Sequence, residues 1–124
     1  MHPLVLVAVG GALGAVARAV LSAAVQARWP APLPWGTSVV NISGCLALGL
    51  LLGWLESRPQ LALAWRSFAA VGVLGAFTTF STFELETLAL LQRGAFPAAV
   101  TNVAGSVVLG LIAVWTGHAV GRLV

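Results

Sequence analysis

GVLGAFTTFSTF, residues 72–83, occupies the centre of an apolar stretch that runs from Trp65 to Leu91. That stretch is long enough to cross a membrane as a helix, which takes about 20 residues, and Thr78 is its midpoint. The glycines, the β-branched residues and the hydroxyl residues at 72–83 are weak helix formers. We therefore predict a transmembrane helix that is broken near the bilayer midplane.

A broken helix is tolerated at that depth only where protein buries it or where it lines water, and its ends are suited to binding ions. The half that ends near Gly75 would present unpaired carbonyl groups, which favour a cation. The half that begins near Ser81 would present unpaired amides, which favour an anion. This stretch is therefore the strongest candidate for an ion path.

Aromatic and hydroxyl side chains lie together just after the predicted break. Phe80 and Phe83 share one helix face, and the positive edges of their rings suit a small anion that has lost part of its water. Ordinary core packing is the alternative for both rings. Ser81 and Thr82 place hydroxyl groups between the rings. Glu86, one turn beyond Thr82, is expected to cap, to pair with an arginine or to lie at the mouth of the path.

Three more apolar stretches of similar length make up most of the remaining chain, at about residues 4–27, 35–56 and 97–121. Of the 124 residues, 60% are hydrophobic and 7% are charged, whereas about 25% charged residues is usual for a soluble domain. We therefore predict one all-α integral membrane domain, residues 1–124, with four transmembrane helices. The third helix is expected to span 65–91 and to follow a connection at 57–64.

The same pattern excludes several classes of function. The four stretches leave no room for a soluble catalytic domain, and the sequence holds no metal-ligand cluster, nucleophile triad or phosphate loop. We therefore do not expect an enzyme. The six basic residues, all of them arginine, form no stripe with interleaved aromatic residues, so we expect no nucleic-acid partner.

Small residues recur at a spacing of four, which lets helix backbones approach closely in a membrane. The pairs are Gly10/Gly14, Gly49/Gly53, Ser106/Gly110 and Gly117/Gly121. They predict tight contacts between helices without indicating a function.

The arginines near the helix ends are almost evenly divided between the two sides of the predicted bundle. With four spans, Arg58, Arg66 and Arg122 fall on the side of the termini, and Arg28 and Arg93 fall on the other. Orientation normally follows an excess of basic residues in the cytoplasmic loops, so a chain this balanced can insert both ways. Two inverted copies would then pair as an antiparallel homodimer. The alternative is that one extra arginine fixes a single orientation.

Polar groups inside the other spans are costly and are therefore candidate site residues. Arg18 in the first span is either a fixed positive charge that favours anions or a structural cap for carbonyl groups. In the second span, Asn41 offers uncharged amide donors one turn after Thr37. In the fourth span, Ser106 follows Asn102 by one turn, and we expect Asn102 to join two helices by a hydrogen bond.

TTFSTF at residues 78–83, preceded by Gly75, resembles the signature of the Fluc (CrcB) fluoride channels. The resemblance extends to GGALGAVAR at residues 10–18, to Gly36-Thr37 and to VNISG at residues 40–44. Together with the chain length and the four spans, it covers essentially the whole chain. The chain departs from the pattern at Asn102, where many members carry tyrosine.

The resemblance implies a dual-topology homodimer in the cell inner membrane that passively exports toxic fluoride through two pores. Residues that match the family's anion path or its surroundings are Arg18, Asn41, Phe80, Ser81, Thr82, Phe83, Glu86 and Ser106. We assign Thr37 to the same path because it precedes Asn41 by one turn. Gly75 and Thr78 match positions whose backbone carbonyls, from both subunits, hold a central structural sodium ion. Fluoride, the lipid bilayer and a second copy of the chain are therefore the expected partners.

Two other functions remain open on the residues alone. A small multidrug-type exporter also has four spans and couples transport to protons, but it needs a membrane-embedded carboxylate in the first span. This chain has Arg18 there instead. A non-transporting scaffold subunit is the second alternative, and it leaves the predicted break in the third span without a purpose.

Overall fold

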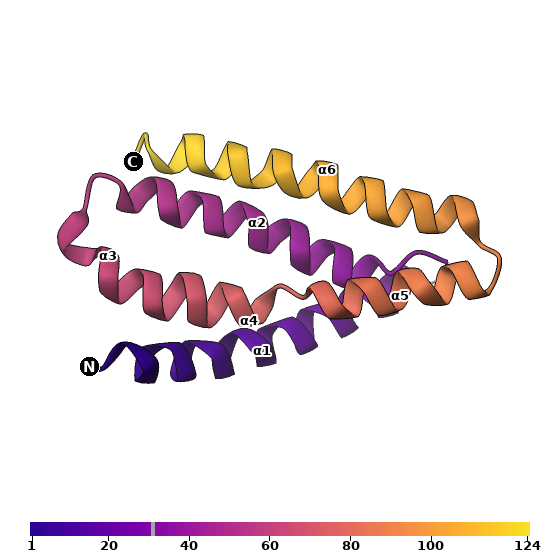
Figure 1. Cartoon of the computed structure of the whole chain (residues 1–124), viewed down its shortest axis with the longest axis horizontal. Coiled ribbons are helices and arrows are strands. Elements are labelled where there is room, and N and C mark those ends of the chain that lie inside the picture. Colours follow the sequence, from indigo (N-terminus) through magenta and orange to yellow (C-terminus); the bar gives the residue numbers. More distant parts are fainter. Residues whose placement is uncertain (31) are drawn as a thin grey trace.

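The computed structural model describes residues 1–30 and 32–124 as an all-helical chain. As predicted, four helical segments are long and apolar enough to cross a membrane: α1 (Pro3–Arg28), α2 (Trp35–Leu55), a composite third segment (Pro59–Gln92) and α6 (Phe96–Gly121). Successive segments run in opposite directions along one long axis, so both termini lie at the same end of the molecule (Figure 1). The chain is built as a multi-pass membrane protein.

The third segment consists of four consecutive pieces: α3 (Pro59–Trp65), the π-helix η1 (Arg66–Leu74), α4 (Gly75–Phe77) and α5 (Phe80–Gln92). It begins at Pro59 rather than Trp65, so the expected connection at 57–64 is wrong for its last six residues. Proline suits the first turn of a helix, because its φ is already fixed and the N–H that it lacks would have no partner there. The π-helical geometry was not predicted.

The helical backbone of the third segment is interrupted between α4 and α5. Thr78 (φ −80°, ψ 153°) and Thr79 (φ −146°, ψ 118°) are extended, and Figure 1 shows an unwound link at this place. The Thr79 hydroxyl accepts a hydrogen bond from the Thr82 N–H at 3.3 Å. The chain after the link therefore starts as a new helix with its own side-chain cap.

Backbone-to-backbone packing joins α2 to α6, which run parallel. A Cβ atom added at Gly49 would lie 2.2 Å from the Val114 carbonyl oxygen of α6, and one at Gly117 would lie 2.3 Å from the Leu46 carbonyl oxygen of α2. The second glycine of each of these predicted pairs repeats the arrangement one turn later. Both pairs therefore lie at a close helix contact, as predicted, where a side chain has no room.

The pair Gly10/Gly14 joins α1 to η1 in the same way. Added Cβ atoms at these two glycines would lie 2.3 Å and 2.0 Å from carbonyl oxygens of η1. At Gly110, by contrast, an added Cβ would meet only the Cys45 Sγ, at an ordinary contact distance of 3.5 Å. The bundle is therefore built from two glycine-packed pairs, α1 with η1 and α2 with α6.

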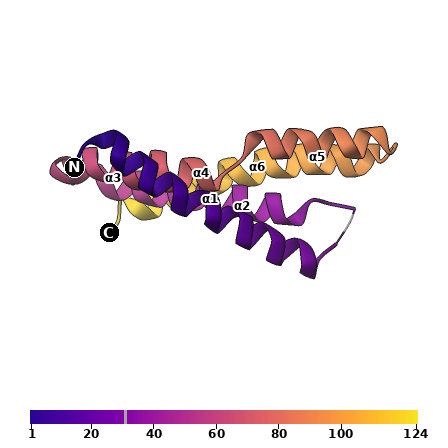
Figure 2. The same ribbon diagram turned by 90° about the horizontal axis from the view of Figure 1, so that it is seen from below.

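Few side chains are enclosed by this thin bundle. The buried hydrophobic residues of the described chain are Val40, Leu55, Phe83, Leu90 and Ala99. Most other large apolar side chains point outwards, as expected where hydrocarbon rather than water surrounds the helices. Figure 2 shows that the α1–α2 hairpin and the α5–α6 hairpin diverge toward the end opposite the termini.

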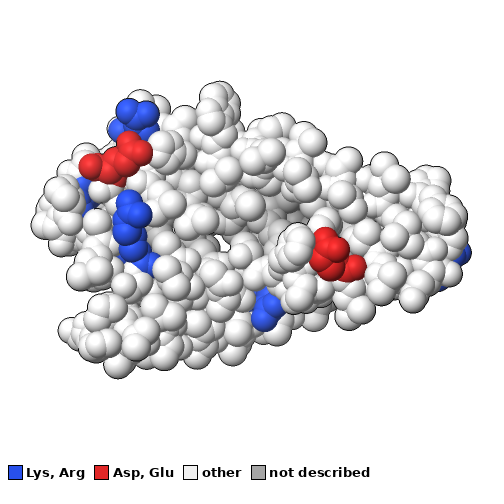
Figure 3. All heavy atoms as spheres, viewed as in Figure 1, with Lys and Arg blue, Asp and Glu red and all other residues white. Residues whose placement is uncertain are grey.

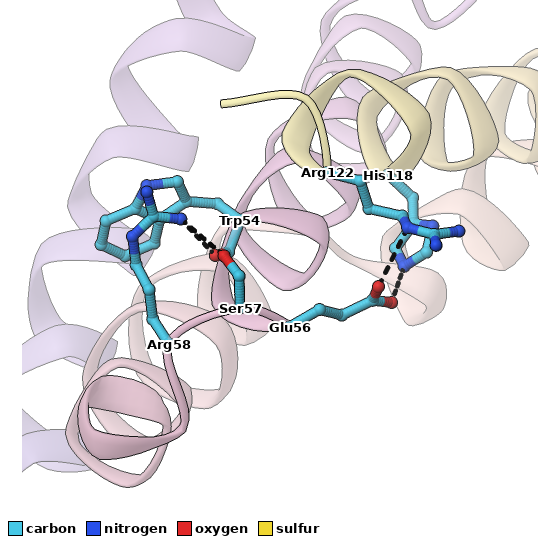
Figure 4. A network of polar contacts seen from close by, with 6 residues as sticks. All are labelled: Trp54, Glu56, Ser57, Arg58, His118 and Arg122. Carbon is cyan, nitrogen blue, oxygen red and sulfur yellow. Dashed lines mark hydrogen bonds and ion pairs between the residues drawn. The ribbon is translucent and has the colours of Figure 1, made fainter.

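Charged side chains on the face drawn in Figure 3 gather mainly at the end that carries the termini. There, Glu56 Oε1 lies 2.6 Å from His118 Nε2, and its Oε2 lies 3.1 Å from Arg122 Nε (Figure 4). Arg58 lies over the Trp54 ring, 4.6 Å from its centroid, and donates to the Trp54 carbonyl oxygen. The Glu56 contacts tie the end of α2 to the end of α6, and the Arg58 contacts hold the turn after α2 against its last residues.

Candidate ion path

The side chain of Asn41 on α2 is hydrogen-bonded to the backbone of the third segment at its interruption. Its Nδ2 donates to the Thr79 carbonyl oxygen at 2.9 Å, and its Oδ1 accepts a hydrogen bond from the Thr79 N–H at 2.7 Å. A side chain of a neighbouring helix thus satisfies both backbone groups of Thr79, which would otherwise need partners of their own. The second N–H of the Asn41 amide is left for another acceptor.

The same contacts release two carbonyl groups. In a continuous α-helix, the Thr79 N–H would bond to the Gly75 carbonyl, and the Thr82 N–H would bond to the Thr78 carbonyl. Here the first amide bonds to Asn41 Oδ1 and the second to Thr79 Oγ1. The Gly75 and Thr78 carbonyls therefore lose their helical donors, and these are the two carbonyls predicted to face a cation.

An open groove of about 260 Å³ lies beside the interruption, between α2 and the third segment. Its lining includes four predicted site residues, Asn41, Gly75, Thr78 and Phe80. Residues that are far apart in the sequence are thus brought to one depression in the surface.

Phe80 and Phe83 are in contact but have different surroundings. Their ring centroids are 5.9 Å apart and their planes are tilted by 42°. Phe83 is buried, whereas the Phe80 side chain is 75% exposed. Ser81 is exposed as well, and the Thr82 hydroxyl lies 3.0 Å from that of Thr79. The first turn of α5 therefore presents a ring and a hydroxyl group that the single chain leaves uncovered.

A second cavity, of about 240 Å³, lies between the α1–α2 connection and α5, where the two hairpins diverge (Figure 2). Glu86 lines it, and the Glu86 Oε1 accepts a hydrogen bond from the Thr37 hydroxyl at 2.8 Å. Ser22 of α1 and Arg93 at the end of α5 line it too. We call it the mouth cavity, because its polar lining lies at the end of the bundle opposite the termini.

Gln26 of α1 shapes the mouth cavity, which it also lines. Its Oε1 accepts a hydrogen bond from the Gly36 N–H at 3.0 Å, and its Nε2 donates to the Leu33 carbonyl at 3.3 Å. It thereby caps the first turn of α2, where Pro34 makes no side-chain cap. Because Thr37 follows Gly36 directly, this cap also fixes the backbone that presents the Thr37 hydroxyl to Glu86.

The other predicted polar residues line neither of these two cavities. Asn102 is buried and donates to the Thr87 hydroxyl of α5 at 2.9 Å, which is the interhelical hydrogen bond expected of it. Ser106, one turn further along α6, is half-buried. Arg18 is half-buried on α1, four residues before Ser22 and on the same helix face.

Several residues of this region carried no functional prediction, among them Gln26, Thr79 and Arg93. Threonine is a favoured residue just before a helix, but this signal helps only once the helix start at Phe80 is known. Gln26 and Arg93 lie near helix ends, where polar residues normally face water, and only the tertiary arrangement brings them to one cavity.

Comparison with known proteins gives a match over nearly the whole chain. A family model described as CrcB-like protein, camphor resistance (CrcB), matches residues 5–118. A protein of Magnetococcus marinus is 49% identical, over 95% of this chain and 96% of its own length. A protein of Solibacter usitatus is 47% identical, over 94% of this chain and 96% of its own length. A protein of Hydrogenovibrio crunogenus is also 47% identical, over 98% of this chain and 93% of its own length. All three relatives are named fluoride-specific ion channel FluC.

Proposed function

Since this chain belongs to the CrcB family, whose model covers nearly all of it, we propose that it is a fluoride-selective channel that lets fluoride leave the cell passively. The family consists of ion channels and not of enzymes. The chain is a multi-pass protein of the cell membrane, which in its bacterial relatives corresponds to the inner membrane.

The interruption at Thr78 and Thr79 is the structural observation that carries this proposal. A channel for a small, strongly hydrated ion has to replace the water that the ion loses. Around the interruption, the free N–H of Asn41, the amides at the start of α5, the Ser81 hydroxyl and the edge of the Phe80 ring are all hydrogen-bonding or positively polarised groups. They suit an anion and carry no full charge, so the ion can also leave.

We assign the anion path from these groups to the mouth cavity. Phe80 and Phe83 line its dry part, and Ser81, Thr82 and Ser106 form a track of hydroxyl groups beside them. The Thr37–Glu86 pair lies toward the mouth cavity, and Arg18 raises the local concentration of anions through its positive charge. If this path is narrow, it would exclude the larger chloride ion by size.

A structural sodium ion fits the carbonyl groups of Gly75 and Thr78. Both carbonyls have lost their helical donors to Asn41 and Thr79, and both residues line the open groove. Unpaired carbonyl oxygens are the ligands that monovalent cations accept in place of water. When bound, the ion would supply positive charge that offsets the repulsion between anions in two pores.

A second, inverted copy of the chain explains how these groups could lie within a membrane. Irregular backbone at membrane depth is tolerated only where protein or water covers it, and the groove and the Phe80 ring are open in the single chain. We therefore place the break near the midplane and infer that an antiparallel partner covers it. The resulting dimer would contain two pores. The nearly even division of arginines between the two ends is compatible with both orientations.

Ion flux from the purified protein in liposomes tests this proposal directly. We expect fluoride to leave the liposomes much faster than from protein-free liposomes, and chloride to be retained. The release of each ion would be recorded with an ion-selective electrode. Fluoride release no faster than that from protein-free liposomes would overturn the proposal, and a proton-coupled cation efflux would favour the exporter.

Replacing Phe80 with isoleucine should reduce fluoride flux by at least about tenfold, a loss of about 1.4 kcal/mol in the rate-limiting barrier. The substitution keeps an apolar side chain but removes the positive ring edge. Phe96→Ile is the matched control, because Phe96 is an exposed phenylalanine outside the groove. Size-exclusion chromatography would show whether both variants keep the wild-type oligomeric state. Wild-type flux in Phe80→Ile would remove this ring from the path.

A further inference from the structure

The carboxyl group of Glu86 has one oxygen that nothing satisfies. Its Oε1 accepts the Thr37 hydroxyl at 2.8 Å. Its Oε2 is enclosed by the chain and has no hydrogen-bond partner, and no other enclosed side-chain nitrogen or oxygen among the described residues is in this position. Because the chain's own atoms already cover this oxygen, a second copy would not reach it in this side-chain conformation.

An ionised carboxylate can only accept hydrogen bonds, and each of its oxygens carries part of the negative charge. An enclosed oxygen of this kind without a donor is strongly unfavourable. A proton on Oε2 removes the charge from the group and turns that oxygen into an O–H donor, while Oε1 keeps its bond from Thr37. The enclosure of Oε2 therefore favours the neutral acid.

The charged groups near Glu86 do not compensate an ionised form. Arg93 lines the same cavity, and Arg18 lies on the face of α1 that also presents Ser22 and Gln26 to it. The ion pairs found among the described residues all involve Glu56, so neither of these arginines is within pairing distance of Glu86. On α2, the group that contacts Glu86 is the uncharged hydroxyl of Thr37. On α6, the uncharged side chain of Asn102 contacts Thr87, the residue that follows Glu86 in α5.

We propose that Glu86 is protonated while the channel conducts, so that the anion path carries no fixed negative charge beside the mouth cavity. This inference rests on the proposed function. Rotation of the side chain would bring the enclosed Oε2 to the mouth cavity, where a hydronium ion would supply the proton, and the proton would return to water there when the pH rises. In that rotated position the O–H would donate to a passing fluoride. The ion leaves as fluoride, and no proton accompanies it.

The test is fluoride flux as a function of pH in proteoliposomes, with the flux of protein-free liposomes subtracted at each pH. If only the neutral acid conducts, wild-type flux falls by up to about tenfold per pH unit above the midpoint of the titration. Glu86→Gln keeps an uncharged side chain with a permanent N–H donor, so its flux should lose this pH dependence. Glu84→Gln is the matched control, because Glu84 is exposed on the same helix, and it should keep the wild-type profile.

Infrared spectroscopy tests the same protonation without any flux. The wild-type protein should show the carbonyl band of a protonated carboxylic acid, which Glu86→Gln should lack and Glu84→Gln should retain. Absence of this band, or a wild-type flux that is independent of pH, would overturn the inference. A pH-dependent flux that persists in Glu86→Gln would also overturn it. If wild-type protein conducts no fluoride at any pH, the proposed function fails instead, and the infrared band still reports on Glu86.

Discussion

Replacing Asn41 with alanine should abolish fluoride flux and destabilise the protein by more than about 3 kcal/mol. The Asn41 amide is the partner of both the N–H and the carbonyl of Thr79. Without it, two backbone groups lose their hydrogen bonds inside a membrane-spanning segment, where each unsatisfied group costs several kcal/mol. The third segment would then close into a continuous helix or unfold locally, and either change removes the freed carbonyls and amides from the path.

The loss of stability would be measured as the shift in the denaturation midpoint of the protein in detergent, and flux would be measured in liposomes. Ser43→Ala is the matched control, because the Ser43 hydroxyl donates only to the Val40 carbonyl one turn earlier in α2. Asn41→Asp separates the two contacts, since it keeps an acceptor for the Thr79 N–H and loses the donor to the Thr79 carbonyl. If Asn41→Ala has the midpoint and flux of the wild type, the side chain does not hold the interruption.

Gly117→Ala should destabilise the fold by about 3 kcal/mol, at the upper end of what overpacking usually costs. The added methyl group would lie 2.3 Å from the Leu46 carbonyl oxygen and 2.9 Å from the Leu50 nitrogen, both of which belong to the α2 backbone. Backbone cannot rotate away as a flexible side chain can. The helices would have to separate along the whole contact, because the neighbouring glycines of both helices depend on the same close approach.

Gly105→Ala makes the same substitution on the same helix where no atom lies within 4 Å of the added methyl group. Because alanine is a better helix former than glycine by about 1 kcal/mol, this variant should be neutral or slightly stabilised. The two variants should therefore shift the thermal denaturation of the detergent-solubilised protein in opposite directions. Equal shifts would show that α2 and α6 are not in backbone contact at Gly117.

The number and positions of the long helices could be predicted from the sequence, because hydropathy and length decide which segments can cross a membrane. The glycine pairs that pack were also visible, since a spacing of four places small residues on one face. The sequence did not show which helices these pairs join, because the spacing alone allows any small-residue face to pack against any other. The helical start at Pro59 was missed, since Ser57-Arg58-Pro59 reads equally as a turn and as a helix start.

The candidate site could be predicted only in part. Weak helix formers marked the region of the interruption, but the two residues that leave the helix are selected by Asn41, which is 38 positions away from Thr79 in the sequence. Local patterns do not encode a contact at that distance. The mouth cavity was missed for the same reason, because its polar lining comes from α1 and α5. The pairing of Thr37 with Glu86 likewise joins two helices whose residues were considered separately.

The two hydrogen bonds between the Asn41 amide and the Thr79 backbone have a kinetic consequence. The link between α4 and α5 is held open by hydrogen bonds that are present without any ion, so an ion that follows the proposed path would not have to unwind a helix. An arriving ion would meet groups that are already oriented, and the pace would be set by how quickly the ion sheds and regains its water. Conduction through such a preorganised path should therefore show a shallow temperature dependence, closer to that of diffusion than to that of a conformational transition.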